Sequence, residues 1–227
     1  MTDKDKKDLP KATAAPTLEV VAFTTMGDSR VLSKPHAMST LFELVAKELG
    51  ATRTLSVPNS YDATKKIEAI FPPVSTGKEK AEKAPPRVIR RVMFVGHGGP
   101  QTGGDYWAFS GSPPPNNDPH NFIMPVTKCL DDASLQTEYL LRSIAERMVD
   151  GGQIWFVSCY NGQTLAERVL KRLKAVKAPN PWVRAYKQEV GFRWLPGSPG
   201  RAQAVVPAPF APVPVTQDSP QFDFSET

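Results

Sequence analysis

The sequence predicts an α/β fold, a three-layer α/β/α sandwich with a mostly parallel central sheet. Strand and helix patterns alternate from Arg87 onward. Two of the strand patterns, residues 92–95 and 154–157, are uninterrupted apolar runs, which is typical of strands covered on both faces. Alternating strands and helices form right-handed crossover units, and such units place helices on both faces of one parallel sheet.

The first part of the chain contributes one strand and two helices to this prediction. Residues 18–23 are rich in β-branched and aromatic side chains and predict a strand. Residues 38–49 carry apolar side chains at helical spacing, and Gly50 supplies a stop signal. A weaker helical pattern covers residues 63–71, and two prolines end it.

The middle of the chain begins with the first strong strand pattern, at residues 87–96. We interpret residues 98–104 as a glycine-rich loop and the aromatic residues 106–109 as one arm of a hairpin. Residues 111–119, rich in proline and asparagine, predict a surface excursion.

The second half completes the alternation of helices and strands. Residues 134–149 form an amphipathic helical pattern, and residues 153–158 predict the next strand. A helix is expected at residues 163–176, where prolines follow, and two further strands at residues 182–186 and 190–194.

These patterns predict a single α/β domain at residues 17–195. Residues 1–16 mix charge with proline and are expected to be disordered. Residues 72–86 are lysine- and proline-rich and are expected to form an exposed linker. From residue 196 to residue 227 the chain is proline-rich without a periodic pattern, which predicts a disordered tail.

Composition excludes several classes of protein. The net charge of +5 over 227 residues is too mild and too scattered for a nucleic-acid surface. No run approaches the roughly 20 apolar residues that span a bilayer, and the charged N-terminus does not resemble a signal peptide. We therefore expect a cytoplasmic protein without membrane contact, although export without a cleaved signal would leave the same pattern. The two cysteines, Cys129 and Cys159, exclude a disulfide framework and suit a reducing compartment.

Two residues that can carry covalent chemistry follow the two apolar runs. His97 comes directly after the first strand and among glycines, and Cys159 comes at the end of the second. The carboxyl ends of parallel strands meet at one edge of a sheet, so these side chains can meet if their two strands are neighbours. Imidazole and thiol are the base and the nucleophile of covalent acyl chemistry.

A mechanism follows from this pair. A nearby imidazole and the N-terminus of the following helix both favour the thiolate of Cys159, and His97 would pass the proton to a leaving amine. The backbone N–H groups of Gly98 and Cys159 are the candidate donors to the oxyanion. This chemistry requires no cofactor and no metal ion.

The sequences Val-Gly-His97-Gly-Gly and Phe-Val-Ser-Cys159-Tyr-Asn-Gly resemble those of the caspase-like cysteine peptidases, which include gingipains, toxin self-cleaving peptidase domains and bacterial CHAT proteases. The resemblance covers about residues 87–186 and implies a caspase–hemoglobinase fold that hydrolyses a protein or peptide substrate through a thioester. It implies His97 as base and acid, Cys159 as nucleophile and Gly98 as an oxyanion donor. The caspase signature Gln-Ala-Cys-x-Gly is absent, so the resemblance is to the wider group. For a specificity pocket, Glu189 and Asp105 are candidates that also read as ordinary surface carboxylates.

Other thiol and glycine-loop sites fit less well. Amidotransferase-type hydrolases place a histidine after the cysteine, and no histidine follows Cys159. Residues 96–104 match neither the Rossmann nor the Walker spacing. A metal site built from His97, His120 and the two cysteines lacks the clustered ligand spacing that such sites show.

The strongest alternative belongs to another class: a catalytically inactive caspase-like domain that binds a partner protein. The proline-rich tail, which includes residues 207–212, would then act as a docking segment. Sequence alone leaves both functions open, because a domain that has lost its pocket can keep its catalytic pair.

Overall fold

The structure of the 227-residue chain is a computed structural model. It describes residues 17–26, 35–73, 84–101, 104–110, 129–130, 135–162, 164–198, 200–206, 213–215 and 223–224. Residues 1–16, most of the predicted linker and the surface excursion at 111–119 lie outside the described residues.

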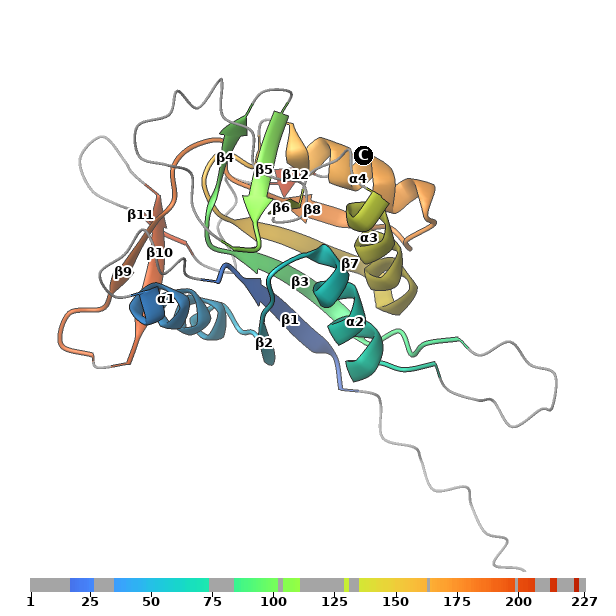
Figure 1. Cartoon of the computed structure of the whole chain (residues 1–227), viewed down its shortest axis with the longest axis horizontal. Helices are drawn as coiled ribbons and strands as arrows, with labels where there is room; N and C mark the ends of the chain where they lie inside the picture. The colour runs from blue at the N-terminus through green and yellow to red at the C-terminus, as the bar shows by residue number, and fades with distance from the viewer. Residues whose placement is uncertain are drawn as a thin grey trace, which may run out of the picture.

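An α/β architecture with a parallel central sheet is confirmed. Five strands pair in parallel in the order β8-β7-β3-β1-β2, and β12 adds an antiparallel edge next to β8. Their bounds are β1 Glu19–Thr24, β2 Arg53–Ser56, β3 Ile89–Val95, β7 Met148–Val157, β8 Trp182–Arg184 and β12 Asp223–Phe224. Two of these strands, β3 and β7, lie side by side at the centre, as Figure 1 shows.

Helices cover both faces of the sheet (Figure 1). Three of them pack on one face: α2 Ser60–Ile70, α3 Leu135–Arg147 and α4 Leu165–Ala175. The fourth, α1 Pro35–Glu48, covers the opposite face. This arrangement is compatible with the predicted three-layer sandwich.

The apolar runs divide between these two cores because successive side chains of a strand point to opposite faces. In β3, Val92 and Phe94 join the core beneath α2, α3 and α4, whereas Met93 and Val95 join the core beneath α1. All four side chains are fully buried. The prediction that these strands are covered on both faces is therefore confirmed.

Two small antiparallel sheets complete the described fold. One joins β4 Gly98–Gln101, β5 Gly104–Ala108 and β6 Cys129–Leu130, in that order. The glycine-rich segment after His97 is thus an edge strand, and the prediction of a loop there is wrong. Glycine and proline, which make up most of this segment, have low strand propensity, so pairing with the aromatic arm decides the conformation.

The second small sheet corrects the predicted end of the domain. It consists of β9 Gly191–Trp194, β10 Ala202–Val206 and β11 Val213–Pro214. Ala202, Ala204 and Val206 are buried against the core beneath α1. The disordered tail predicted from residue 196 is therefore wrong for this segment, whereas residues 207–212 lie outside the described residues.

A search for membrane-spanning helices among the described residues found none long and apolar enough to cross a bilayer.

Candidate active site at two neighbouring strand ends

His97 and Cys159 follow strands that are direct neighbours in the sheet. Val95 of β3 pairs in register with Val157 of β7, and the Gly96 N–H donates to the Val157 carbonyl at 3.1 Å. Each candidate residue therefore lies two positions beyond the last register pair. The two strand ends remain in contact, since a Cβ placed on Gly98 would lie 2.9 Å from the Cys159 carbonyl oxygen.

Both candidate side chains belong to the face of the sheet that α1 covers. The alternation that sends Met93 and Val95 to this face continues to His97, whose ring meets Phe42 of α1 edge to face, with centroids 5.2 Å apart. Cys159 is partly buried and packs against the same core. The structure thus places the predicted base and nucleophile at one edge and on one face of the sheet.

The backbone of His97 is fixed on two sides. Its N–H donates to the Thr25 hydroxyl at 3.0 Å, and its carbonyl accepts from the Ala108 N–H at 2.9 Å. Thr25 is buried and in turn donates to the Ala108 carbonyl at 2.7 Å. Gly96 reaches this geometry at a φ of +147°, and a Cβ there would lie 2.1 Å from the Thr25 hydroxyl oxygen, so only glycine fits.

At Cys159, in contrast, the side chain itself is hydrogen-bonded. The Val190 N–H donates to Sγ at 3.3 Å, and the thiol donates to the Val190 carbonyl at 3.6 Å. The Tyr160 N–H donates to the Gln188 carbonyl at 3.0 Å, and this bond ties the backbone of the same turn to the segment before β9. Tyr160 has a φ of +57°, an uncommon conformation for a non-glycine residue. A tight turn therefore presents the thiol to the segment that ends at Val190.

Burial favours the neutral form of both groups in this arrangement. It lowers the pKa of His97, because a partly buried imidazolium loses hydration. Burial also raises the pKa of the Cys159 thiol, and the nearby Glu189 carboxylate raises that pKa further, although the Val190 N–H opposes the shift. In the described part of the chain no hydrogen bond joins the His97 ring to the thiol. The site is therefore held as imidazole and thiol.

The helix that follows Cys159 does not serve the thiolate. α4 begins at Leu165, on the opposite face of the sheet. The carboxylate of Asp105 already accepts from the first amides of α4, those of Thr164 at 2.6 Å and Leu165 at 3.3 Å. The expected support from a helix N-terminus is therefore wrong. Asp105 is a buried helix cap, and its interpretation as a surface or specificity carboxylate is wrong as well.

A buried asparagine links the two strand ends. Asn161 donates through Nδ2 to the Tyr106 carbonyl of β5 at 2.6 Å, and its Oδ1 accepts from the Ser158 hydroxyl. A Cβ on Gly98 would lie 2.7 Å and 2.8 Å from the two side-chain polar atoms of Asn161. The turn after Cys159 is therefore packed directly against the backbone of the predicted oxyanion donor.

The remaining candidate residues that the structure describes form no metal site here. Among the described residues, no group of three or more His, Cys, Asp or Glu side chains could hold a metal ion. Cys129 is buried in β6 beside Tyr106 and Ala108. His120 lies outside the described residues. Glu189 is exposed beside the Cys159 turn and remains the one specificity candidate that faces this region.

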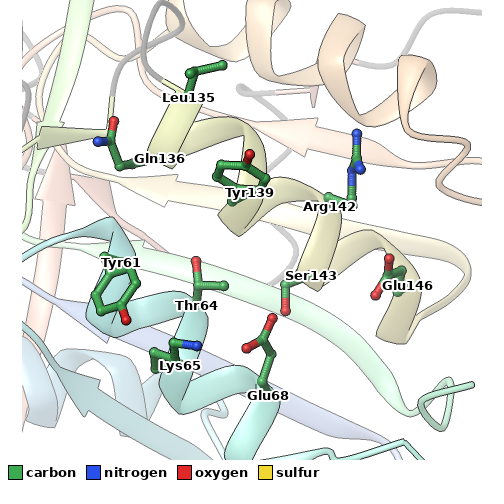
Figure 2. Close-up of a pocket in the computed structure, with 10 residues that line it drawn as sticks. All are labelled: Tyr61, Thr64, Lys65, Glu68, Leu135, Gln136, Tyr139, Arg142, Ser143 and Glu146. Atoms are coloured by element: carbon green, nitrogen blue, oxygen red, sulfur yellow. The ribbon is translucent and has the colours of Figure 1, made fainter. Parts of the chain in front are cut away.

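A separate groove of about 460 Å³ lies between α2 and α3, on the helical layer of the other face (Figure 2). Tyr61 and Tyr139 stand on its two walls, and both side chains are exposed. None of its lining residues belongs to the strand ends that carry His97 and Cys159. The groove is thus unrelated to the predicted chemistry.

Sequence reasoning missed three residues that shape the site: Thr25, Phe42 and Val190. Thr25 had a usable signal, because it follows the carboxyl end of β1 just as His97 and Cys159 follow their strands. Phe42 belongs to a stripe of apolar residues on α1, and nothing in the sequence distinguishes it from the other residues of that stripe. Val190 acts through its backbone, which no side-chain pattern reveals.

A scan against protein-family models found no match for this chain, and searches of curated proteins and of solved structures found none either.

Proposed function

We propose that this chain is a cysteine peptidase of the caspase-like group, with Cys159 as nucleophile and His97 as base and acid. The observation that carries the proposal is the in-register pairing of β3 with β7, which brings both residues to one edge and one face of the sheet. The parallel sheet with helices on both faces is compatible with a caspase–hemoglobinase fold. The substrate is a protein or peptide.

In the proposed reaction, His97 accepts the thiol proton as Sγ attacks the carbonyl carbon of the scissile bond. The backbone N–H groups of Gly98 and Cys159 donate to the oxyanion. The C–N bond then breaks, and His97 gives its proton to the leaving amine, which leaves a thioester on Cys159. A water molecule that loses a proton to His97 hydrolyses the thioester and frees the thiol.

The substrate must also release the thiol from its resting contacts. In the structure Sγ bonds to the Val190 backbone, and both reacting groups are neutral. We therefore expect the substrate carbonyl to displace the Val190 contact, while the His97 ring turns toward sulfur. Because the ring of His97 has no hydrogen bond in the described part of the chain, this rotation breaks none.

A non-catalytic function is the second candidate, and the same contact favours it. A thiol bonded on both sides by Val190 and neutral at pH 7 is also what a domain that only binds a partner would show. In that case the proline-rich residues 207–212 would be a docking segment for a partner protein.

Peptide cleavage separates the two candidates. The full chain and its Cys159→Ala variant are incubated with a peptide library made from a digested proteome, and new termini are identified by mass spectrometry. We expect cleavages by the wild type that disappear in Cys159→Ala and persist in Cys129→Ala, the control for the buried thiol. Equal sets of termini from wild type and Cys159→Ala would contradict a peptidase and favour the binding module.

A further inference from the structure

We propose that Asn161 is a positioning residue that holds the Gly98 amide beside Cys159, and so builds the oxyanion site of the proposed peptidase. The inference rests on the proposed function. It concerns a residue whose side chain reaches both strand ends and which takes no part in the proton transfers described above.

The first argument is the burial and bonding of Asn161. Its side chain is fully buried, and both of its polar atoms are used, one by the Tyr106 carbonyl and one by the Ser158 hydroxyl. Its own carbonyl accepts from the Ala166 N–H of α4 at 3.1 Å. A buried amide with both functions satisfied is held in a single orientation. Asn161 thus ties the turn after Cys159 to β5.

The second argument is what lies against Asn161. Gly98 of β4 pairs with Trp107 of β5, next to the Tyr106 carbonyl that Asn161 holds. Gly98 approaches the Asn161 amide so closely that any Cβ would collide with it and with the Cys159 carbonyl. The position of the Gly98 backbone relative to Cys159 therefore depends on the Asn161 side chain.

The third argument concerns the direction of the Gly98 amide. In an antiparallel pair, alternate residues turn both backbone groups toward the partner strand. The His97 carbonyl accepts from the Ala108 N–H of the hairpin partner, so the next residue, Gly98, turns its N–H away from β5. β4 is the edge of its sheet. The Gly98 N–H is thus not used by β5, and within the described residues it is available to serve an oxyanion.

The test compares two reactions of the same thiol. Peptide hydrolysis passes through an oxyanion, whereas alkylation of Cys159 by iodoacetamide does not. In Asn161→Ala we expect kcat/KM for a cleaved peptide to fall about 100-fold, mostly in kcat, the loss typical of an oxyanion donor. The alkylation rate of Cys159, followed by peptide mass mapping, should stay within about twofold of wild type, since the base and the thiol remain in place.

A matched variant isolates the contact with β5. Ser158→Ala removes the hydroxyl but keeps the bond from Asn161 to Tyr106, so its kcat should fall much less than that of Asn161→Ala. Asn161→Asp keeps an acceptor for Ser158 but loses the donor to Tyr106, and it should lose as much activity as Asn161→Ala. It also serves as the second variant if Asn161→Ala fails to fold.

Two results would overturn the inference. Wild-type kcat in either Asn161 variant would show that the amide needs no such support. A parallel loss of alkylation and hydrolysis in a folded Asn161 variant would show a general structural role. Failure of the proposed function is distinguishable, because it appears earlier, as equal cleavage by wild type and Cys159→Ala, and the inference then falls with it.

Discussion

The two strand ends at the centre of the sheet hold their reactive residues in opposite ways. At the end of β3 the backbone of His97 is bonded to Thr25 and Ala108, while its ring packs edge to face against the ring of Phe42. At the end of β7 the side chain itself is bonded, since the Cys159 thiol contacts both backbone groups of Val190.

This difference assigns separate tasks to the two ends. In the proposed peptidase, the histidine end would be a fixed support for a ring that turns, whereas the cysteine end would be a turn that releases its thiol. Phe42 connects the two, because it meets His97 on one side and Phe192 of β9, two residues after Val190, on the other, with ring centroids 4.8 Å apart. Because different contacts hold the two ends, variants that act on one end alone should still have separable effects.

The largest expected effect comes from Gly98→Ala, which acts where the two ends touch. A Cβ at this position would lie within 3 Å of Asn161 and of the Cys159 carbonyl, so the backbone of β4 must move. We expect kcat to fall about 100-fold or more through loss of an oxyanion donor, with a destabilisation of about 1–3 kcal/mol from overpacking. Peptidase kinetics and urea denaturation measure the two effects.

Gly99→Ala is the matched control for this prediction. Its Cβ would lie 3.6 Å from the Tyr106 hydroxyl, an ordinary contact, so both activity and stability should stay near wild type. If Gly99→Ala lost as much activity as Gly98→Ala, the effect would belong to the strand in general and not to the contact between the two ends.

A smaller effect is expected from Thr25→Val, which loosens the histidine end alone. The variant removes an acceptor for the His97 N–H and a donor to the Ala108 carbonyl, both in a buried setting. We expect a destabilisation of about 1–3 kcal/mol for the unsatisfied partners, and a loss of kcat smaller than that of Gly98→Ala. The alkylation rate of Cys159 should fall along with kcat, because His97 is the base for both reactions.

The neighbouring residue provides the control. Thr24 is buried too, but its hydroxyl has no hydrogen-bond partner in the described part of the chain. Thr24→Val should therefore be neutral or slightly stabilising. If Thr24→Val destabilised the protein as much as Thr25→Val, this result would contradict a specific role of the Thr25 hydroxyl.

The smallest effect concerns pH and the cysteine end. Because burial and the Glu189 carboxylate raise the pKa of Cys159, its alkylation rate should still increase with pH above about 8.5, where an ordinary thiol is half ionised. Glu189→Gln should move this profile to lower pH, and Glu68→Gln, on α2, should leave it unchanged. An alkylation rate that levels off well below pH 8.5 would contradict the neutral resting thiol.

The same shifts have a stability consequence whose sign can be worked out. Above the ordinary thiol pKa, the unfolded chain releases a proton that folded Cys159 retains, so stability falls as pH rises through that range. His97 acts at the other end of the scale: its pKa is lowered on folding, so stability falls as pH drops below about 6.5. Urea denaturation of wild type and His97→Gln at pH 7 and pH 5 measures this second contribution, which the variant should lack.

Strands with strong apolar runs were predictable from sequence, and so was their parallel direction in one sheet. β3 and β7 each contain four consecutive apolar residues, and the helix pattern between them predicts parallel strands. Their direct adjacency is shown by the structure. The positions of His97 and Cys159 at one edge follow from the same two runs. Local pattern was sufficient here because burial on both faces leaves a strong signature in the chain.

Segments whose composition conceals a strand, and contacts made over a long stretch of chain, were not predictable. Residues 98–101 read as a loop because of their glycines, and β10 was hidden in a proline-rich stretch, yet both are paired strands. The roles of Val190 and Asp105 likewise depend on contacts with residues tens of positions away. Nothing within a short window of sequence records such a contact.

The rate at which iodoacetamide alkylates Cys159 at pH 7, in the wild type and in His97→Ala, tests most directly whether the two strand ends act together. Peptide mass mapping separates Cys159 from Cys129. A dyad predicts that the rate in His97→Ala falls at least about 100-fold, the low end of what a positioned base supplies. An unchanged rate in a folded His97→Ala protein would contradict the dyad.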